Sequence, residues 1–204
     1  AASGKGTIAR ALARHFGLPH MDTGLLYRAV ALNLWRWGGD PGNEFEALRA
    51  CGELGVDPDD SELRSEPVSK IASRVSAYPA VREALLERQQ DFARQAGGAV
   101  LDGRDIGTII APEAEVKLFV TASPEIRAER RLKELHGRGM DAPLADVLAD
   151  ILARDERDTH RAVAPLKQAP DALFLDTSEL DVEAAIAEAL RLVKNRLEMS
   201  RNGS

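Results

Sequence analysis

Residues 1–7 read Ala-Ala-Ser-Gly-Lys-Gly-Thr and stand directly before an amphipathic segment with Ile8, Leu12 and Phe16 on one helical face. Small residues let backbone amides curl around phosphate oxygens, and a helix that begins here adds its partial positive charge. Lys5 would bring a point charge to the β- and γ-phosphates of a nucleotide. The stretch predicts a phosphate-binding loop (P-loop), and the alternative is an ordinary glycine-rich turn.

The loop departs from the complete motif in two places. The complete motif has another glycine four residues before Ser3-Gly4 and an apolar strand ahead of that glycine; the sequence contains neither. Gly6 follows Lys5 where Ser or Thr usually offers Mg²⁺ a hydroxyl, so the candidate metal hydroxyl moves to Thr7.

Helical and short apolar segments alternate along the chain, which is the pattern of an α/β fold with a parallel sheet between helices. Helices are predicted over 6–16, 25–37, 44–54, 66–77, 79–95, 124–136, 144–158 and 182–197. Strands are predicted over 18–21, 99–101, 116–120 and 172–175. The acidic segment 57–63 has no apolar pattern and is predicted to be a loop.

Composition narrows the function classes. The length of 204 residues fits one domain, and the net charge of −6 gives no overall basic field for nucleic acid or an anionic membrane. Cys51 is the single cysteine, which excludes an internal disulfide and a cysteine metal cluster. No apolar run reaches the roughly 20 residues of a membrane helix, and no signal peptide is recognisable, so we expect a cytoplasmic protein.

A second charged stretch, Leu101-Asp102-Gly103-Arg104-Asp105, follows the predicted strand 99–101. Ligands of α/β sheets lie at the carboxyl ends of strands. Asp102 is then placed to orient water bound to Mg²⁺, and Arg104 can hold a phosphate through a two-pronged contact. The alternative is a polar turn after a strand.

Arginines gather on two consecutive predicted helices. Arg154, Asp158 and Arg161 share one helical face, flanked by Asp155 and Arg157. The preceding helix and turn carry Arg127, Arg130, Arg131 and Arg138. A solvated face with ion pairs is the alternative, but two such helices in an acidic protein favour a clamp over polyphosphate, whose transfer needs positioned positive charge.

The chain resembles bacterial cytidylate kinases, which are P-loop nucleoside monophosphate kinases. Lys-Gly-Thr is how the loop at residues 1–7 reads in such kinases. Four further stretches match in the family's order: Met-Asp-Thr-Gly-Leu-Leu-Tyr-Arg (21–28), Tyr-Pro-Ala-Val-Arg-Glu-Ala-Leu-Leu (78–86), Leu-Asp-Gly-Arg-Asp-Ile-Gly-Thr (101–108) and Arg-Asp-Glu-Arg-Asp-Thr-His-Arg-Ala-Val-Ala-Pro-Leu (154–166). The loop is shared by many families, whereas 101–108 and 154–166 together are highly specific.

The resemblance implies a role for each matching residue. ATP is expected at Ser3, Gly4, Lys5, Gly6, Thr7, Arg127 and Arg130. The CMP phosphate is expected among Thr23, Arg28, Arg64 and Arg104, and cytosine against Ser73, Arg82 and Asp105. Arg154, Asp158 and Arg161 are expected to reach the CMP ribose and the transferring phosphates. Residues expected to act in transfer are Lys5, Arg104, Arg131, Arg154, Asp158 and Arg161, with Mg²⁺ at Thr7 and, through water, Asp102.

The base assignment has a physical reason. Cytosine presents an N4 amino donor, which a carboxylate such as Asp105 accepts. Uracil presents an O4 acceptor at the same place and would be repelled by that carboxylate. The resemblance therefore implies ATP-dependent phosphorylation of CMP or dCMP, giving ADP and CDP or dCDP.

The implied fold is one domain, 1–204, with a five-stranded parallel sheet of order 2-3-1-4-5 whose first strand precedes Ala1. A CMP-binding subdomain is expected at about 24–95 and a short mobile lid (LID) at about 127–145. Segment 55–63 stands where bacterial members carry a small antiparallel insertion. We expect a monomer that binds small nucleotides and neither nucleic acid nor membrane.

Two alternatives remain at this point. One is a kinase for UMP or another small acceptor, against which Asp105 and Ser73 argue. The other is a non-catalytic nucleotide-binding module. A GTPase-like switch would need an Asn-Lys-x-Asp segment that reads guanine, and the sequence has none.

Overall fold

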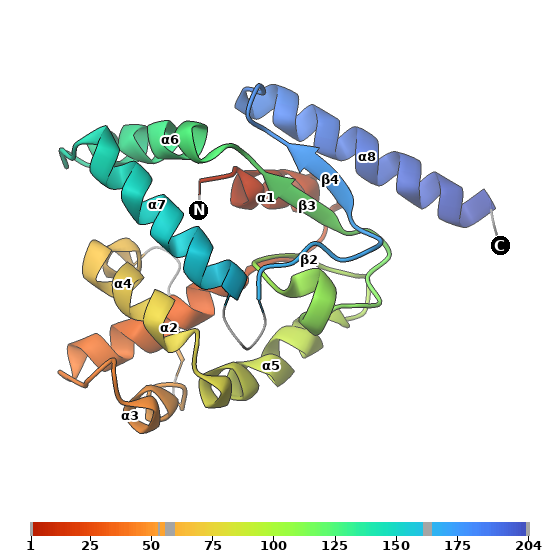
Figure 1. The fold of residues 1–204 in the computed structure, drawn as a ribbon. Helices are drawn as coiled ribbons and strands as arrows, with labels where there is room; N and C mark the ends of the chain where they lie inside the picture. The colour runs from red at the N-terminus through yellow and green to blue at the C-terminus, as the bar shows by residue number, and fades with distance from the viewer. Residues whose placement is uncertain (1, 53, 56–59, 161–164, 203–204) are drawn as a thin grey trace.

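The computed structural model describes residues 2–52, 54–55, 60–160 and 165–202. Within these residues the strands form two parallel pairs. The pairs are β1 (His20–Asp22) with β2 (Val100–Asp102) and β3 (Leu118–Thr121) with β4 (Leu173–Asp176). Helices separate the strands along the sequence, so the predicted α/β class is confirmed (Figure 1).

An apolar cavity of about 770 Å³ has walls from both strand pairs. Leu101 of β2 and Phe119 of β3 line it, together with Ile8 and Leu12 of α1 (Lys5–Phe16). In the described part of the chain no backbone ladder joins β2 to β3. The structure thus contains two outer strand pairs with an apolar space between them.

A group of helices follows β1 and packs around one core. Its members are α2 (Thr23–Arg36), α3 (Glu44–Arg49), the 3₁₀ helix η1 (Ser61–Arg64), α4 (Glu66–Val75) and α5 (Pro79–Ala93). Val30 and Leu34 of α2 are fully buried against Leu63, Val68 and their neighbours. Figure 1 shows this group well away from the carboxyl-terminal helix.

Two helices form an antiparallel pair beside the strands. α6 (Pro124–Gly137) begins with Ser123 as its cap, as predicted, and α7 (Leu144–His160) packs on it through Ala128, Val147 and Ile151. The last helix, α8 (Val182–Asn202), packs on α1 (Figure 1). No helix of the described residues combines the length and apolar character that crossing a membrane requires.

Three local predictions differ from the structure. The third helix ends at Arg49 rather than at Leu54, where the nearby Gly52 is a poor helix former. Ser61–Arg64 forms η1, which overlaps the end of the predicted loop 57–63; residues 57–59 of that loop lie outside the described residues. Ile106–Ile110 forms a π-helical turn, η2, which was not predicted because no periodic pattern in the sequence marks it.

Candidate active site

The phosphate-binding loop leads directly into α1. Gly4 has a φ of 88°, in the left-handed region that glycine adopts without strain. Among the described residues no side chain caps the start of α1, and its first turn contains no acidic residue. The first amides of a helix need acceptors, so this end of α1 offers N–H groups and partial positive charge to an anion.

Lys5 connects this loop electrostatically to both strand ends. Burial, the largest cause, lowers its pKa below the ordinary value, and Arg104 and Arg154 lower the pKa further. Asp102 and Asp22 act in the opposite direction. An ammonium group held among cations gains strongly from a nearby anion, so the position of Lys5 suits a phosphate ligand.

Asp22 and Asp102 face each other at the carboxyl ends of β1 and β2. Asp102 accepts a hydrogen bond from Thr23 Oγ1 at its carbonyl oxygen (2.9 Å), and its carboxylate lies 2.7 Å from His20 Nε2. A side chain on Gly103 would collide with Thr23 Oγ1, so the tight packing of this turn requires glycine. These contacts fix the backbone that leads to Arg104 and Asp105.

The donor set near the loop fits a hydrated magnesium ion. A Cβ atom on Gly6 would lie 3.9 Å from Asp102 Oδ1, so this carboxylate borders the loop. Thr7 is exposed, and its hydroxyl accepts a hydrogen bond from Arg10 (3.3 Å). The described residues contain no cage of three or more His, Cys, Asp or Glu. Mg²⁺ usually keeps several waters and needs only one or two protein carboxylates beside substrate phosphates.

A second, small cavity of about 40 Å³ lies among α2, α4, α5, α7 and the turn after β2. It brings together many of the predicted CMP-binding residues: Thr23, Arg28, Ser73, Arg82, Arg104, Asp105 and Arg154. Arg64 is exposed and does not line it, although its charge acts on Arg28. This cavity is called the acceptor pocket below.

Positive charge exceeds negative charge in the acceptor pocket. Asp105 accepts a hydrogen bond from Arg82, and Arg104 Nε lies 2.5 Å from Asp158 Oδ2. Arg28 donates to neutral acceptors, the carbonyl oxygen of Leu63 and the hydroxyl of Ser69, at 2.9 and 2.7 Å. Burial, followed by the charges of neighbouring arginines, lowers the pKa of Arg28. These features favour an anionic ligand.

Arg154 has a buried polar atom that its described neighbours leave unsatisfied. Its Nε is buried and, among the residues that the structure describes, has no hydrogen-bond partner. Asp158 Oδ2 lies 4.0 Å away, beyond hydrogen-bonding distance. Burial, followed by the charge of Arg104, lowers the pKa of Arg154 to about 10. A buried, unsatisfied guanidinium N–H is costly, and a phosphate or hydroxyl oxygen would satisfy it.

The arginines of α6 have different surroundings. Arg127 is buried and paired with Asp155 of α7, so it does not lie on the solvated face that the alternative interpretation expected. Arg130 donates to the hydroxyl and carbonyl oxygens of Thr177, and its Nη1 lies 3.5 Å from the carbonyl oxygen of Ser3. Arg131 contacts Glu66 of α4 at 3.5 Å, and Arg138 donates to the carbonyl oxygen of Arg64. Arg161 lies outside the described residues.

Sequence reasoning missed two residues that support the site. Thr177, which is fully buried, hydrogen-bonds the carbonyl oxygen of Ser3 at 2.8 Å and so attaches the phosphate-binding loop to the end of β4. Asp155 was noted only as a neighbour of Arg154, yet it holds Arg127 from the next helix. A polar residue two positions after the predicted strand 172–175 was the available signal for Thr177.

Comparison with known proteins bears on this geometry. The family model described as cytidylate kinase matches residues 1–195. A cytidylate kinase from Xanthobacter autotrophicus is 57% identical over 96% of this chain and 94% of its own length. One from Methylocella silvestris is 54% identical over 100% of this chain and 94% of its own length. With this match over nearly the whole length, and with a phosphate-binding loop beside an arginine-lined pocket, the chain belongs to the cytidylate kinase family.

Proposed function

We propose that the chain transfers the γ-phosphate of ATP to CMP or dCMP, giving ADP and CDP or dCDP. The observation that carries the proposal is the proximity of donor and acceptor sites. Lys5 of the phosphate-binding loop lines the same cavity as Arg104, which also lines the acceptor pocket, and the charges of Arg104 and Arg154 act on Lys5. The names of the related proteins support the same activity.

On the donor side, residues 3–7 bind the ATP phosphates through backbone amides and the Lys5 ammonium group. Arg130 lies against the loop and belongs to the ATP side in this proposal. Arg127 is assigned to ATP by family resemblance, and that assignment stays a prediction. Mg²⁺, held by Thr7 and by Asp102 through water, would neutralise charge on the β- and γ-phosphates when bound.

On the acceptor side, the CMP phosphate binds Thr23, Arg28, Arg64 and Arg104, and the ribose and transferring phosphates reach Arg154, Asp158 and Arg161. Cytosine lies against Ser73, Arg82 and Asp105. An ionised carboxylate has two acceptor oxygens, so Asp105 can hold Arg82 and still accept the N4–H donor of cytosine. Uracil would bring an acceptor to that place.

The chain's residues position the reactants and stabilise charge. Phosphoryl transfer spreads negative charge over the equatorial oxygens of the moving group. Lys5, Arg104, Arg131, Arg154 and Arg161 supply positive charge around that group, and Asp158 orients Arg104. No general base is needed, because in-line positioning and charge neutralisation account for such catalysis.

The finer architecture is part of the same proposal. A further strand between β2 and β3 would fill the apolar space and complete a parallel sheet of order 2-3-1-4-5. Residues 24–95 would form the CMP-binding subdomain and 127–145 the lid. A pocket of about 40 Å³ is far smaller than a nucleotide, so we expect these parts to move apart before CMP binds.

A coupled assay of ADP release tests the function. Purified protein is given ATP and Mg²⁺ with CMP, dCMP, UMP, AMP or no acceptor. We expect fast ADP release with CMP or dCMP and slow release otherwise. Equal rates with UMP would support the broader kinase alternative, and nucleotide binding without release would support a non-catalytic module.

A further inference from the structure

Arg127 of α6 and Asp155 of α7 form a two-pronged ion pair. Arg127 Nη1 donates to Asp155 Oδ1 at 2.8 Å, and Nη2 donates to Oδ2 at 2.5 Å. Arg127 Nε donates to the carbonyl oxygen of Ala122 at 2.9 Å. Since all three nitrogens of the guanidinium group are engaged, its position is fixed in distance and in direction.

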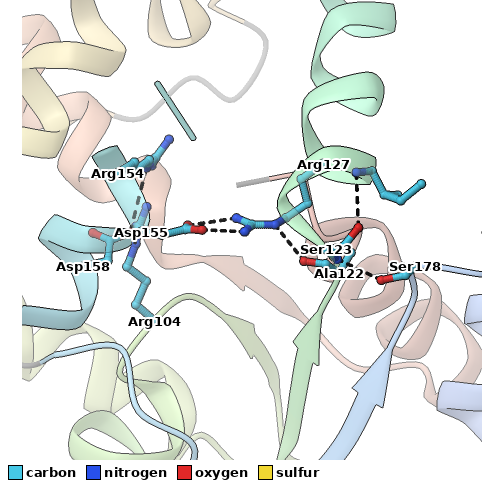
Figure 2. Close-up of polar contacts among 9 residues, drawn as sticks. Arg104, Ala122, Ser123, Arg127, Arg154, Asp155, Asp158 and Ser178 are labelled. Carbon is cyan, nitrogen blue, oxygen red and sulfur yellow. Dashed lines mark hydrogen bonds and ion pairs between the residues drawn. The ribbon is translucent and has the colours of Figure 1, made fainter. Parts of the chain in front are cut away.

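The strand end that holds Arg127 is itself anchored. Ala122 and Ser123 follow directly on β3. The Ser123 amide donates to the Ser178 hydroxyl at 2.8 Å, which ties this corner to the segment after β4. The Ser123 hydroxyl also accepts from the Ile126 amide and caps α6. Asp155 therefore binds the guanidinium group of Arg127, which is itself hydrogen-bonded to the end of β3 (Figure 2).

Asp155 stands beside the acceptor-site residues of α7. Successive helical residues are turned by about 100°, so Arg154 and Asp158 share one side of the helix and Asp155 lies on a neighbouring side. Figure 2 shows Asp155 reaching toward Arg127, while Asp158 lies between Arg104, 2.5 Å away, and Arg154, 4.0 Å away. The same stretch of α7 thus contacts α6 through Asp155, lines the acceptor pocket through Arg154 and holds Arg104 of that pocket through Asp158.

The pair is more shielded from water than an ordinary surface ion pair. Only 9% of the Arg127 side chain and 32% of the Asp155 side chain are exposed. Burial alone would raise the pKa of Asp155, but its hydrogen bonds to Arg127 and the charge of that residue outweigh burial, and the pKa is lowered. A buried arginine is expensive to desolvate, which makes geometry a more plausible use for it than stability.

We propose that Asp155 and Arg127 are positioning residues for the acceptor site. Their ion pair sets the rotation of α7 about its own axis and so brings Arg154 and Asp158 to Arg104. The inference rests on the proposed contact of Arg154 and Asp158 with CMP. This role replaces the ATP contact that family resemblance implies for Arg127, whose three guanidinium nitrogens all have protein acceptors. Arg127 then acts through α7, and its removal impairs the use of CMP rather than of ATP.

The test compares steady-state kinetics of Asp155→Asn, Arg127→Gln and the double variant. A displacement of about 1 Å can cost on the order of 100-fold in rate, so we expect kcat/KM for CMP to fall about 10- to 100-fold. The KM for ATP should stay within about twofold, and the double variant should be no worse than either single one, since both break one contact. Glu156→Gln, an exposed change on the same helix, is the matched control and should have no effect.

Asp158→Asn separates this proposal from the assignment of the acceptor site. If Asp155 acts through α7, Asp155→Asn should cause a smaller fold-loss in the Asp158→Asn background than in the wild type, because only the placement of Arg154 remains to be disturbed. If Asp155→Asn lowered kcat/KM for CMP by the same factor in the Asp158→Asn background as in the wild type, the positioning role would be overturned. A rise in the KM for ATP alone in Arg127→Gln would show a direct ATP contact and would overturn it as well.

Melting temperature and circular dichroism accompany each variant. A variant that melts earlier but keeps wild-type kinetics below its transition would show a merely structural pair. Should Asp155→Asn fail to fold, Asp155→Glu keeps the charge while shifting the carboxylate, and a CMP-specific loss is again expected. If Asp158→Asn leaves the kinetics with CMP unchanged, the assignment of the acceptor site is wrong. If Asp158→Asn impairs the use of CMP but Asp155→Asn does not, only the positioning role of the Arg127–Asp155 pair is wrong.

Discussion

Arg82 and Asp105 form an ion pair inside the acceptor pocket, and both side chains are buried. Arg82 also donates to the carbonyl oxygen of Ser76 at 3.0 Å and lies over the Tyr27 ring, 5.4 Å from its centroid. These contacts hold the guanidinium group, and the guanidinium group holds the carboxylate. Asp105 is therefore a fixed acceptor at the place where we propose that cytosine binds.

Asp105→Asn should weaken the choice of cytosine over uracil. The amide keeps the shape of the side chain but replaces one acceptor oxygen with a donor. A hydrogen bond to a charged group contributes about 1.5–3 kcal/mol, so kcat/KM for CMP should fall roughly 10- to 150-fold. The value for UMP should fall less or rise, and the KM for ATP should change little.

The values of kcat/KM for CMP and for UMP should be measured on one preparation of the variant, together with its melting temperature. Loss of the charge leaves Arg82 buried without its ion, so a lower melting temperature is also expected. An equal fall for CMP and UMP would mean that Asp105 serves only to hold Arg82, and would remove it from the base-recognition site.

Lys5→Ala should abolish most phosphoryl transfer without unfolding the protein. Removal of a charge from a developing phosphate typically costs on the order of 10² to 10³ in rate. Burial already lowers the pKa of Lys5, so the free protein does not depend on this charge for stability. Turnover and melting curves decide the outcome, with exposed Lys194→Ala as the control. Near wild-type turnover in Lys5→Ala would rule out the phosphate-binding role.

The proposed lid touches the proposed CMP-binding subdomain at two points. Arg131 Nη2 lies 3.5 Å from Glu66 Oε2, and Arg138 Nη1 donates to the carbonyl oxygen of Arg64 at 3.3 Å. Both contacts are at the surface, where ion pairs contribute about 0–1 kcal/mol. They are weak enough to open when a nucleotide enters the acceptor pocket.

Hydrogen exchange should report this movement. Amides of residues 130–145 should exchange more slowly when ATP and CMP analogues are both bound, because closure excludes water from the phosphates. Glu66→Gln removes one surface contact and should speed exchange there in the free protein. Protection that is the same with and without both nucleotides would contradict a mobile lid.

Local signals made much of this fold predictable. Ser123 followed by Pro124 marked the start of α6, and Gly17 marked the end of α1, because caps depend on neighbouring residues alone. The turn η2 was missed because its π-helical hydrogen bonds, such as Ala111 N–H to the Ile106 carbonyl oxygen, leave no periodic pattern in the sequence.

The candidate site was predictable in content but not in pairing. The sequence marks Arg82, Arg104, Asp105 and Asp158 as candidates, yet it does not show which carboxylate meets which arginine. Arg104 and Asp105 are neighbours, but Arg104 pairs with Asp158 and Asp105 pairs with Arg82. These choices depend on how α5 and α7 approach the turn after β2, which is a property of tertiary packing.

Arg154 illustrates a conflict between stability and function. Its pKa is lowered from the ordinary arginine value to about 10, chiefly by burial and then by Arg104, so the folded state disfavours its charge. Below pH 10 the guanidinium group is charged in both folded and unfolded states, and the destabilisation is fully present. The destabilisation disappears only as the pH rises above about 10, toward the higher pKa of arginine in the unfolded chain.

Arg154→Met should therefore stabilise the free protein at neutral pH and impair CMP phosphorylation. One pKa unit corresponds to about 1.4 kcal/mol, and with allowance for partial exposure we expect a gain on the order of 1–3 kcal/mol in the free energy of unfolding. Urea unfolding at pH 7.5 measures the gain. Arg157→Met, a change at the exposed neighbouring residue, is the control, and its free energy of unfolding should stay within about 0.5 kcal/mol of wild type.

Added CMP should raise the stability of the wild type more than that of Arg154→Met, because a bound phosphate satisfies the charge that only the wild type carries. A destabilised Arg154→Met protein, or an equal response to CMP, would show that Arg154 is already satisfied within the fold and does not await an anionic ligand.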